Sequence, residues 1–117
     1  MKKFKERRRC KRYKMLNSPS VMIYPERVLS YSVLDVSDTG LAFSYIGWVE
    51  LPIEEIKIDF FDLDRELFFE NIQAKVINDI LLKEKQKNLR RCSVEFSFGD
   101  NDQKENWRRY IEGVATN

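Results

Sequence analysis

The sequence predicts a mainly β domain: a six-stranded antiparallel β-barrel with a C-terminal α-helix and a flexible basic N-terminal arm. Three observations lead to this fold class. Short apolar runs that alternate with polar residues recur along residues 19–99, as expected of half-buried strands. The period then changes to that of a helix within residues 100–117, whereas residues 1–18 are polar and basic. A chain of 117 residues is long enough for one core, so we expect a single domain over residues 1–117.

Six runs of residues predict the strands of the barrel. Each is rich in β-branched or aromatic residues, or alternates apolar with polar side chains. In chain order, the runs are residues 21–24, 28–36, 41–45, 56–60, 66–82 and 89–98. Pro25 marks the end of the first run, and residues 62–65 predict a hairpin turn that lacks glycine. Antiparallel strands at such short spacing favour a small barrel, and residues 48–51 could cover one end of it.

The last segment predicts one amphipathic helix. Its apolar residues recur at i, i+3, i+4 and i+7, which lie on one face of a helix. These residues are Trp107, Tyr110, Ile111 and Val114. Asp102 with Glu105 forms a capping-box pattern at the start, and Gly113 predicts the end.

Charge is distributed unevenly along the chain. The net charge is only +2, but residues 1–14 hold nine basic residues and one acidic residue, a net charge of +8. The remainder holds 12 basic and 18 acidic residues, a net charge of −6. A basic arm on an acidic body calls for an anionic partner: a nucleotide, a nucleic acid, a membrane surface or an acidic protein.

The chain has no histidine, the commonest general base and metal ligand. Its acidic residues scatter along positions that we expect to be exposed, without a defensible catalytic pair. We therefore predict a binding protein rather than an enzyme, with no catalytic residue, no metal site and no cofactor.

Neither membrane insertion nor secretion is expected. No apolar stretch approaches the ~18–20 residues that cross a bilayer, and the basic start is not followed by the apolar run of a signal peptide. We therefore expect a cytoplasmic protein. Cys10 and Cys92 form no metal-binding pattern; unpaired thiols in a reducing cytoplasm are the favoured state, and a disulfide is the open alternative.

Two clusters carry chemical information. Arg8 and Arg12 are four residues apart, so they share one face in a helix and also in a strand, and both can converge on one anion. Guanidinium forks suit phosphate oxygens and the O6/N7 edge of guanine. Taken alone, the pair is better explained by a solvated basic tail.

The second cluster is an Asp-x-Ser-x-x-Gly turn at residues 35–40. In a strand, Asp35 and Ser37 point to the same face, where an aspartate can accept from the N–H edge of guanine. Gly40 permits either a positive φ or a close backbone approach. The alternative is an ordinary turn in which the aspartate and serine bond their own backbone.

The two clusters together resemble the motifs of the PilZ domain family, receptors for the bacterial second messenger cyclic di-GMP. The Arg-x-x-x-Arg motif matches at Arg8 and Arg12, and the Asp-x-Ser-x-x-Gly motif at the turn of residues 35–40. Val94-Glu95-Phe96 followed by a helix is also similar to the family, and the likeness covers nearly the whole chain. Ser93 departs from it, because members often have glycine there.

The resemblance implies a receptor or adaptor that binds cyclic di-GMP on the outer surface of the barrel and regulates a partner protein. By carry-over, Arg8 and Arg12 clamp the ligand, Asp35 and Ser37 address a guanine, and Gly40 shapes the turn. Arg7, just before the motif, matches members that take up a stacked pair of ligands. The arm over residues 5–18 would order when the messenger binds.

Two alternatives remain. A nucleic-acid-binding barrel could use Phe4, Tyr13 and Tyr24 to stack bases beside the basic arm, although an acidic body and Asp35 make nucleic acid an unfavoured partner. A PilZ-like protein-interaction module that has no ligand is the other alternative.

Overall fold

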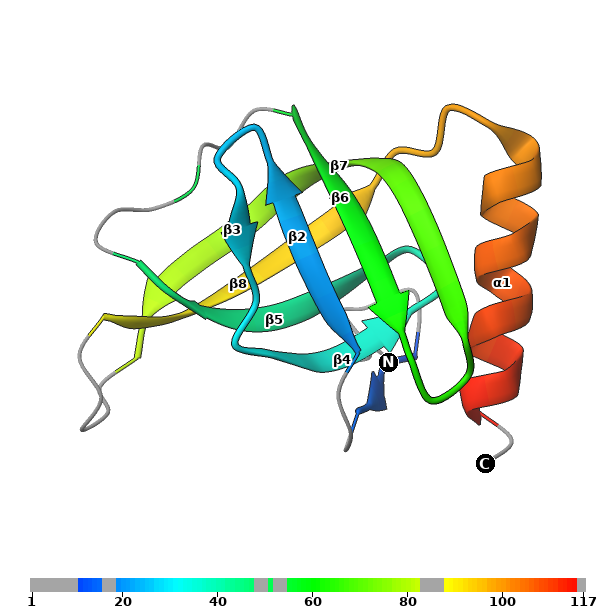
Figure 1. Ribbon diagram of the computed structural model, residues 1–117, viewed down its shortest axis with the longest axis horizontal. Helices are drawn as coiled ribbons and strands as arrows, with labels where there is room; N and C mark the ends of the chain where they lie inside the picture. Colours follow the sequence, from blue (N-terminus) through cyan, green and yellow to red (C-terminus); the bar gives the residue numbers. More distant parts are fainter. Residues whose placement is uncertain (1–10, 16–18, 48–50, 52–54, 83–87, 116–117) are drawn as a thin grey trace, which may run out of the picture.

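The computed structural model describes residues 11–15, 19–47, 51, 55–82 and 88–115. Within these ranges it contains eight strands and one helix (Figure 1). They are β1 (Tyr13–Lys14), β2 (Ser20–Tyr24), β3 (Val28–Leu29), β4 (Ser32–Ser37), β5 (Gly40–Ile46), β6 (Glu55–Asp62), β7 (Leu67–Leu81), β8 (Leu89–Phe96) and α1 (Asn101–Ala115). The predicted mainly β class with one C-terminal helix is confirmed.

All eight strands belong to one antiparallel sheet in the order β1-β4-β5-β8-β7-β6-β2-β3. The sheet curls until its two ends meet near residues 30 and 31. The backbone N–H of Ser30 donates to Val21 in β2 (2.9 Å), and the next N–H, of Tyr31, donates to Ser44 in β5 (2.7 Å). This corner closes the barrel, and α1 lies along one side of it (Figure 1).

The strand count differs from the expected six for two reasons. The run over residues 28–36 was expected to be one strand, but it divides into β3 and β4. The break falls at Ser30 and Tyr31, where successive backbone groups change partner from β2 to β5. The second reason is β1, which forms inside the segment expected to be a flexible arm.

The C-terminal part of that arm belongs to the barrel. Tyr13 and Lys14 pair with β4, and the N–H of Met15 donates to the carbonyl of Leu34 (3.0 Å). Tyr13 and Met15 also pack against the core. Burial of these two apolar side chains favours an ordered segment, so the expectation of a flexible arm is wrong for residues 13–15. Residues 1–10 and 16–18 lie outside the described residues.

The core lies between the curled sheet and α1. In β2 and β6, inward-facing residues alternate with outward-facing ones, as the period-two pattern predicts, whereas β5 is buried from Gly40 to Tyr45. The helix adds Trp107, whose ring packs edge to face on Phe60 (5.0 Å) and Phe96 (5.0 Å). Leu51 is buried, as expected of a residue that covers one end of the barrel; Trp48 and Val49 lie outside the described residues.

The helix begins and ends at residues other than those expected. Asp100 caps it, because its Oδ1 accepts from the N–H of Asp102 (2.8 Å). Asp102 therefore lies in the first turn rather than at the cap. The helix also continues through Gly113 to Ala115. A glycine lowers helix propensity, but here it does not set the end, since the buried face formed by Trp107 and its neighbours holds the helix.

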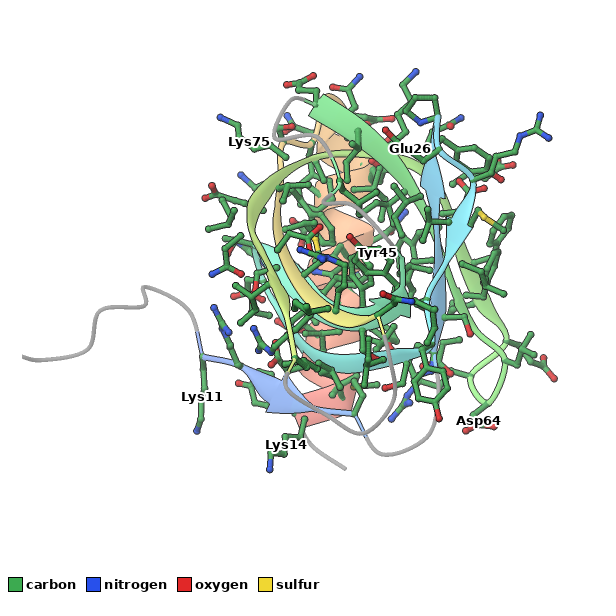
Figure 2. All side chains as sticks on the ribbon, turned by 90° about the vertical axis from the view of Figure 1, so that its left-hand side faces the viewer. Lys11, Lys14, Glu26, Tyr45, Asp64 and Lys75 are labelled. Carbon is green, nitrogen blue, oxygen red and sulfur yellow. The ribbon has the colours of Figure 1, made fainter. Side chains whose placement is uncertain are left out.

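Two carboxylates are buried, contrary to the expectation that the acids are exposed. Asp79 accepts from the Tyr45 hydroxyl, from the N–H of Leu51 (2.8 Å) and from Nε of Arg90 (2.9 Å). Burial, together with this carboxylate, raises the pKa of Tyr45. Figure 2 shows Tyr45 among the side chains enclosed by the strands.

Asp62, at the end of β6, is the second buried carboxylate. Its Oδ2 accepts from the Tyr110 hydroxyl of α1 (2.8 Å) and pairs with Arg65 (3.1 Å). Its Oδ1 accepts from the N–H of Arg65 (3.2 Å), which closes the hairpin turn predicted at residues 62–65. Glu66 takes the left-handed conformation (φ 57°) that a glycine would ordinarily supply. Both buried acids are fully partnered, so they are structural groups.

Candidate ligand-binding site

Asp35 and Ser37 lie on β4, and the pairing with β1 shows which way they face. Tyr13 pairs with Val36, and both contribute to the core. Lys14 pairs with Asp35, so these two residues take the alternate, outer face. Ser37 is two residues beyond Asp35, but it is buried, and its placement toward a ligand stays a prediction.

Strand β1 places Arg12, the last residue of the Arg-x-x-x-Arg motif, near the outer face of β4. Arg12 precedes Tyr13, and antiparallel pairing directs it toward Ser37. Arg12 is exposed and two residues from Lys14, which gives it the same outward parity. Figure 2 shows Lys11 and Lys14 projecting from β1 at one side of the barrel. Arg7 and Arg8 lie outside the described residues.

Gly40 begins β5, and the structure distinguishes between its two expected roles. No described glycine has a positive φ. Instead, an ideal Cβ at Gly40 would lie 2.1 Å from the carbonyl oxygen of Val94 in β8. Any side chain here would collide with backbone, so glycine is required for the close approach of β5 to β8.

The Ser37 hydroxyl is engaged in the turn itself. Its Oγ accepts from the N–H of Thr39 (3.3 Å) and donates to the carbonyl of Gly40 (3.4 Å). The carbonyl of Ser37 in turn accepts from Nε1 of Trp107 in α1 (2.8 Å). The serine thus behaves as in an ordinary turn, and a direct contact with a ligand stays a prediction.

Asp35 does not bond its own turn. Its Oδ2 lies 3.5 Å from Nη2 of Arg91, and Nη1 of the same guanidinium donates to Ser93 Oγ (3.2 Å). The side chains of Arg91 and Asp35 are 29% and 16% exposed, so the pair is accessible from solvent. Arg91 was not among the residues of the predicted site. Arg91 lies 56 residues after Asp35 in the chain, yet the fold brings the two side chains together.

The alternation of β8 could have indicated the direction of Arg91. Cys92 and Val94 were expected on the inner face, which leaves Arg91 and Ser93 on the outer face. The sequence does not reveal that β8 lies beside β5, and it is this neighbour that brings Arg91 to Asp35.

The floor between these groups consists of small side chains. Ala42 pairs with Ser93, and Ser44 pairs with Arg91. Gly40, Ala42, Ser44 and Ser93 are small and buried, whereas the side chains of Asp35 and Arg91 beside them are partly exposed. We call the face formed by Arg12, Lys14, Asp35, Ser37, Gly40, Ala42, Ser44, Arg91 and Ser93 the arginine–aspartate face.

The electrostatics of the arginine–aspartate face suit an anion that also carries a hydrogen-bonding base. Arg12, Lys14 and Arg91 supply fixed donors and positive charge, which match phosphate oxygens and the O6/N7 edge of a guanine. Asp35 supplies an acceptor for the opposite edge of that base.

Metal chemistry and a membrane span find no support in the described ranges. Over those ranges, no three or more Asp, Glu or Cys side chains gather in a way that could hold a metal ion. The described helix is too short and too polar to cross a bilayer. Cys92 is a buried free thiol, and burial raises its pKa to about 12; Cys10 lies outside the described residues.

Fold and face together define a small antiparallel barrel with a basic edge strand beside an aspartate turn on its outer wall. The family model described as PilZ domain matches residues 6–113. The chain therefore belongs to the PilZ domain family. Among curated proteins, none matches the sequence.

Solved structures share the fold at low sequence identity. The complex of K. pneumonia MrkH with cyclic di-GMP aligns with a TM-score of 0.76 and 17% identity, over 95% of this chain and 52% of MrkH. The PilZ domain of YcgR from Escherichia coli with cyclic di-GMP gives 0.71 and 18%, over 95% of this chain and 93% of that domain. Bacillus subtilis MotI, an inhibitor of motility, gives 0.65 and 19%, over 95% and 52%. The chain thus spans about half the length of MrkH and MotI.

Proposed function

We propose that this chain is a receptor for cyclic di-GMP that binds the messenger on the arginine–aspartate face and then regulates a partner protein. The observation that carries the proposal is the pairing of β1 with β4. It sets the end of the Arg-x-x-x-Arg motif on the same face as Asp35 and Arg91. Family membership supports the same ligand, as do the cyclic di-GMP complexes of MrkH and YcgR.

Each motif residue has a role in this proposal. Arg8 and Arg12 clamp phosphates and the O6/N7 edge of a guanine, and Arg7 contacts a second, stacked ligand. Asp35 accepts from the N–H edge of a guanine. Ser37 and Gly40 set the shape of the turn, and the serine hydroxyl can exchange one of its long bonds for the ligand.

Arg91 gives Asp35 a partner that a ligand can replace. Its guanidinium neutralises Asp35 while no ligand is bound, at a distance of 3.5 Å that is long for a charge-assisted bond. A guanine that bonds Asp35 would free Arg91 to turn toward a phosphate or toward the base. The exchange costs little, because both side chains are partly solvated already.

The regulatory step follows from charge. The basic residues ahead of β1 repel one another, and a ligand with two phosphates offsets this repulsion. We infer that binding orders the segment before Tyr13 over the ligand, and that the changed surface then acts on a downstream protein.

Isothermal titration of cyclic di-GMP into the full chain tests the proposal. Arg12→Ala and Asp35→Ala should each weaken binding about 5- to 150-fold, since one good bidentate contact is worth about 1–3 kcal/mol. Arg108→Ala is the matched control, because Arg108 is an exposed arginine on α1. Equal loss in the control, or heat of binding with RNA and none with cyclic di-GMP, would contradict the proposal.

A further inference from the structure

A second surface of unusual composition lies on the hairpin that joins β6 to β7. Phe61 and Phe68 face each other across the two strands, with their rings stacked at 5.2 Å and 14°. Their sequence neighbours Phe60 and Phe69 point inward, so this stacked pair points outward. The Phe68 residue is 55% exposed, and Leu63 in the turn is 81% exposed. We call Phe61, Leu63, Leu67 and Phe68 the hairpin surface.

Acidic residues surround the hairpin surface. Asp64 and Glu66 lie in the turn, Asp59 precedes Phe61 by two residues, and Glu70 follows Phe68 by two. Residues two apart in a strand share a face, so Asp59 and Glu70 are expected on the side of the stacked rings, next to the bulge at Asn71. Asp59 accepts from the N–H of Asn71 through Oδ1 (2.9 Å), which leaves its charge in place.

The one basic residue of the turn does not offset this charge. Arg65 pairs with the buried Asp62 (3.1 Å) and lies over the ring of Tyr110 (5.9 Å from its centroid). Apart from the Arg65–Asp62 pair, the turn therefore carries the acidic side chains Asp64 and Glu66 beside exposed apolar side chains. Solvent-exposed apolar groups inside a charged border are typical of interaction sites.

The hairpin is also held in place. The Tyr110 hydroxyl bonds Asp62, and the N–H of Arg65 bonds the same carboxylate, so the turn is fastened to α1. A surface that is already ordered loses little conformational entropy when a partner binds. Figure 2 shows Asp64 on the side of the barrel away from Lys11 and Lys14, so a partner here would leave the arginine–aspartate face open.

We propose that the hairpin surface docks a segment of a partner protein that presents apolar side chains between lysines or arginines. The apolar groups would cover Leu63 and the Phe61–Phe68 pair, and the basic groups would meet the surrounding carboxylates. Charge complementarity identifies the partner: an acidic segment would be repelled at this border. The proposal does not depend on which ligand the arginine–aspartate face binds.

The same strand offers a matched control. Ile77 lies further along β7 and is 55% exposed, the same fraction as Phe68. Of the residues two positions away in the strand, Lys75 is basic, and the Asp79 carboxylate is buried and bonded to Arg90. A substitution at Ile77 therefore removes a similar exposed apolar group that has no acidic border.

The test is fluorescence anisotropy with a labelled synthetic peptide that alternates leucine and lysine, titrated with the full chain. We expect binding that Phe68→Ser weakens about tenfold and that Ile77→Ser leaves unchanged. Leu63→Ser, in the exposed turn, should act like Phe68→Ser and provides a second variant should the first fail to fold. A peptide of serine and lysine should bind more weakly, and one of leucine and glutamate should not bind.

Three results would overturn the proposal. The first is no binding of the leucine–lysine peptide, and the second is equal loss in Ile77→Ser and Phe68→Ser. The third is self-association of the chain in sedimentation velocity that Phe68→Ser abolishes, since this would assign the hairpin surface to a second copy.

Discussion

Among the described residues, two adjacent arginines of β8 each pair with an aspartate, one in the interior of the barrel and one on its outer wall. Arg90 faces inward and bonds Asp79 at 2.9 Å, with side chains 9% and 4% exposed. Arg91 faces outward and approaches Asp35 at 3.5 Å, with side chains 29% and 16% exposed. The alternation of a strand thus sends two neighbouring, identical side chains into different environments.

The difference indicates what each pair does. In the interior, Asp79 also accepts from Tyr45 and Leu51, so every part of the carboxylate is used and neither charge can leave without a large cost. On the outer wall, water replaces a lost partner at little cost. The inner pair is therefore a structural element, and the outer pair is suited to exchange its partner for a ligand.

Breaking the inner pair should have the largest effect. Arg90→Met leaves the Asp79 charge buried without its cation, and we expect the free energy of unfolding to fall by about 3–5 kcal/mol. Urea unfolding measures this, with Arg91→Met as the control on the outer wall, for which we expect a change below about 1 kcal/mol. Equal losses of unfolding free energy in Arg90→Met and Arg91→Met would show that the inner pair stabilises the fold no more than the outer pair does.

Tyr45→Phe is a milder change to the same interior group. It removes the hydroxyl that donates to Asp79 and keeps the ring against Phe43. A hydrogen bond to a buried charge contributes about 1.5–3 kcal/mol, so urea unfolding should show a loss of this size. Tyr31→Phe is the control, because Tyr31 is exposed; a loss as large there would refute the assignment.

When ligand binding is measured instead of stability, a change in the outer pair should have the larger effect, and Arg91→Ala tests this. Calorimetric titration with cyclic di-GMP should show an affinity about 5- to 150-fold lower, because one arginine contact is lost. Tyr45→Phe, folded at the assay temperature, should bind like the unmodified chain. An unchanged affinity in Arg91→Ala would mean that Arg91 serves only to hold Asp35.

The smallest predicted effect concerns alkaline pH. Burial, and then the charge of Asp79, raises the pKa of Cys92 from 9.0 to about 12. Above about pH 9 the thiol ionises in the unfolded chain and stays protonated in the folded one. Its contribution to stability is therefore fully present below this pH and is lost as pH rises, by about 1 kcal/mol near pH 10.

Urea midpoints at about pH 8 and pH 10 check this prediction. Between these two pH values, Cys92→Ala should lose less stability than the unmodified chain, whatever its stability at pH 8. The Arg91–Asp35 pair on the outer wall predicts no loss of stability at alkaline pH. An equal slope in Cys92→Ala and the unmodified chain would place the alkaline sensitivity elsewhere.

Local sequence patterns were sufficient to predict much of the fold. Alternation predicted the strands, and the i, i+3, i+4 and i+7 spacing predicted the buried face of α1. The turn motif predicted Asp35 and Ser37 on one face; the pairing with β1 shows that Asp35 faces outward, and Ser37 is buried. Gly40 was identified as necessary, although only the 2.1 Å approach to Val94 decided between its two expected roles.

Features that depend on distant pairing were missed. Nothing near Tyr13 predicts that it joins β4, and nothing near Ser30 predicts that the chain changes partner there. Asp79 looked exposed because its compensating groups come from β5, β8 and the segment at Leu51. Arg91 was missed for the same reason, because its partner lies 56 residues away.

The bond from Trp107 to the carbonyl of Ser37 gives this chain a built-in optical and magnetic probe. The indole lies wholly inside the core, yet its N–H ends on the turn beside the arginine–aspartate face. A ligand that shifts this turn would change the length of the hydrogen bond between Ser37 and the Trp107 indole. The indole would respond although it lies in the core, away from the ligand. The indole proton resonance of Trp107 and its solvent exchange rate would therefore report occupancy of the outer wall from within the hydrophobic core, without any added label.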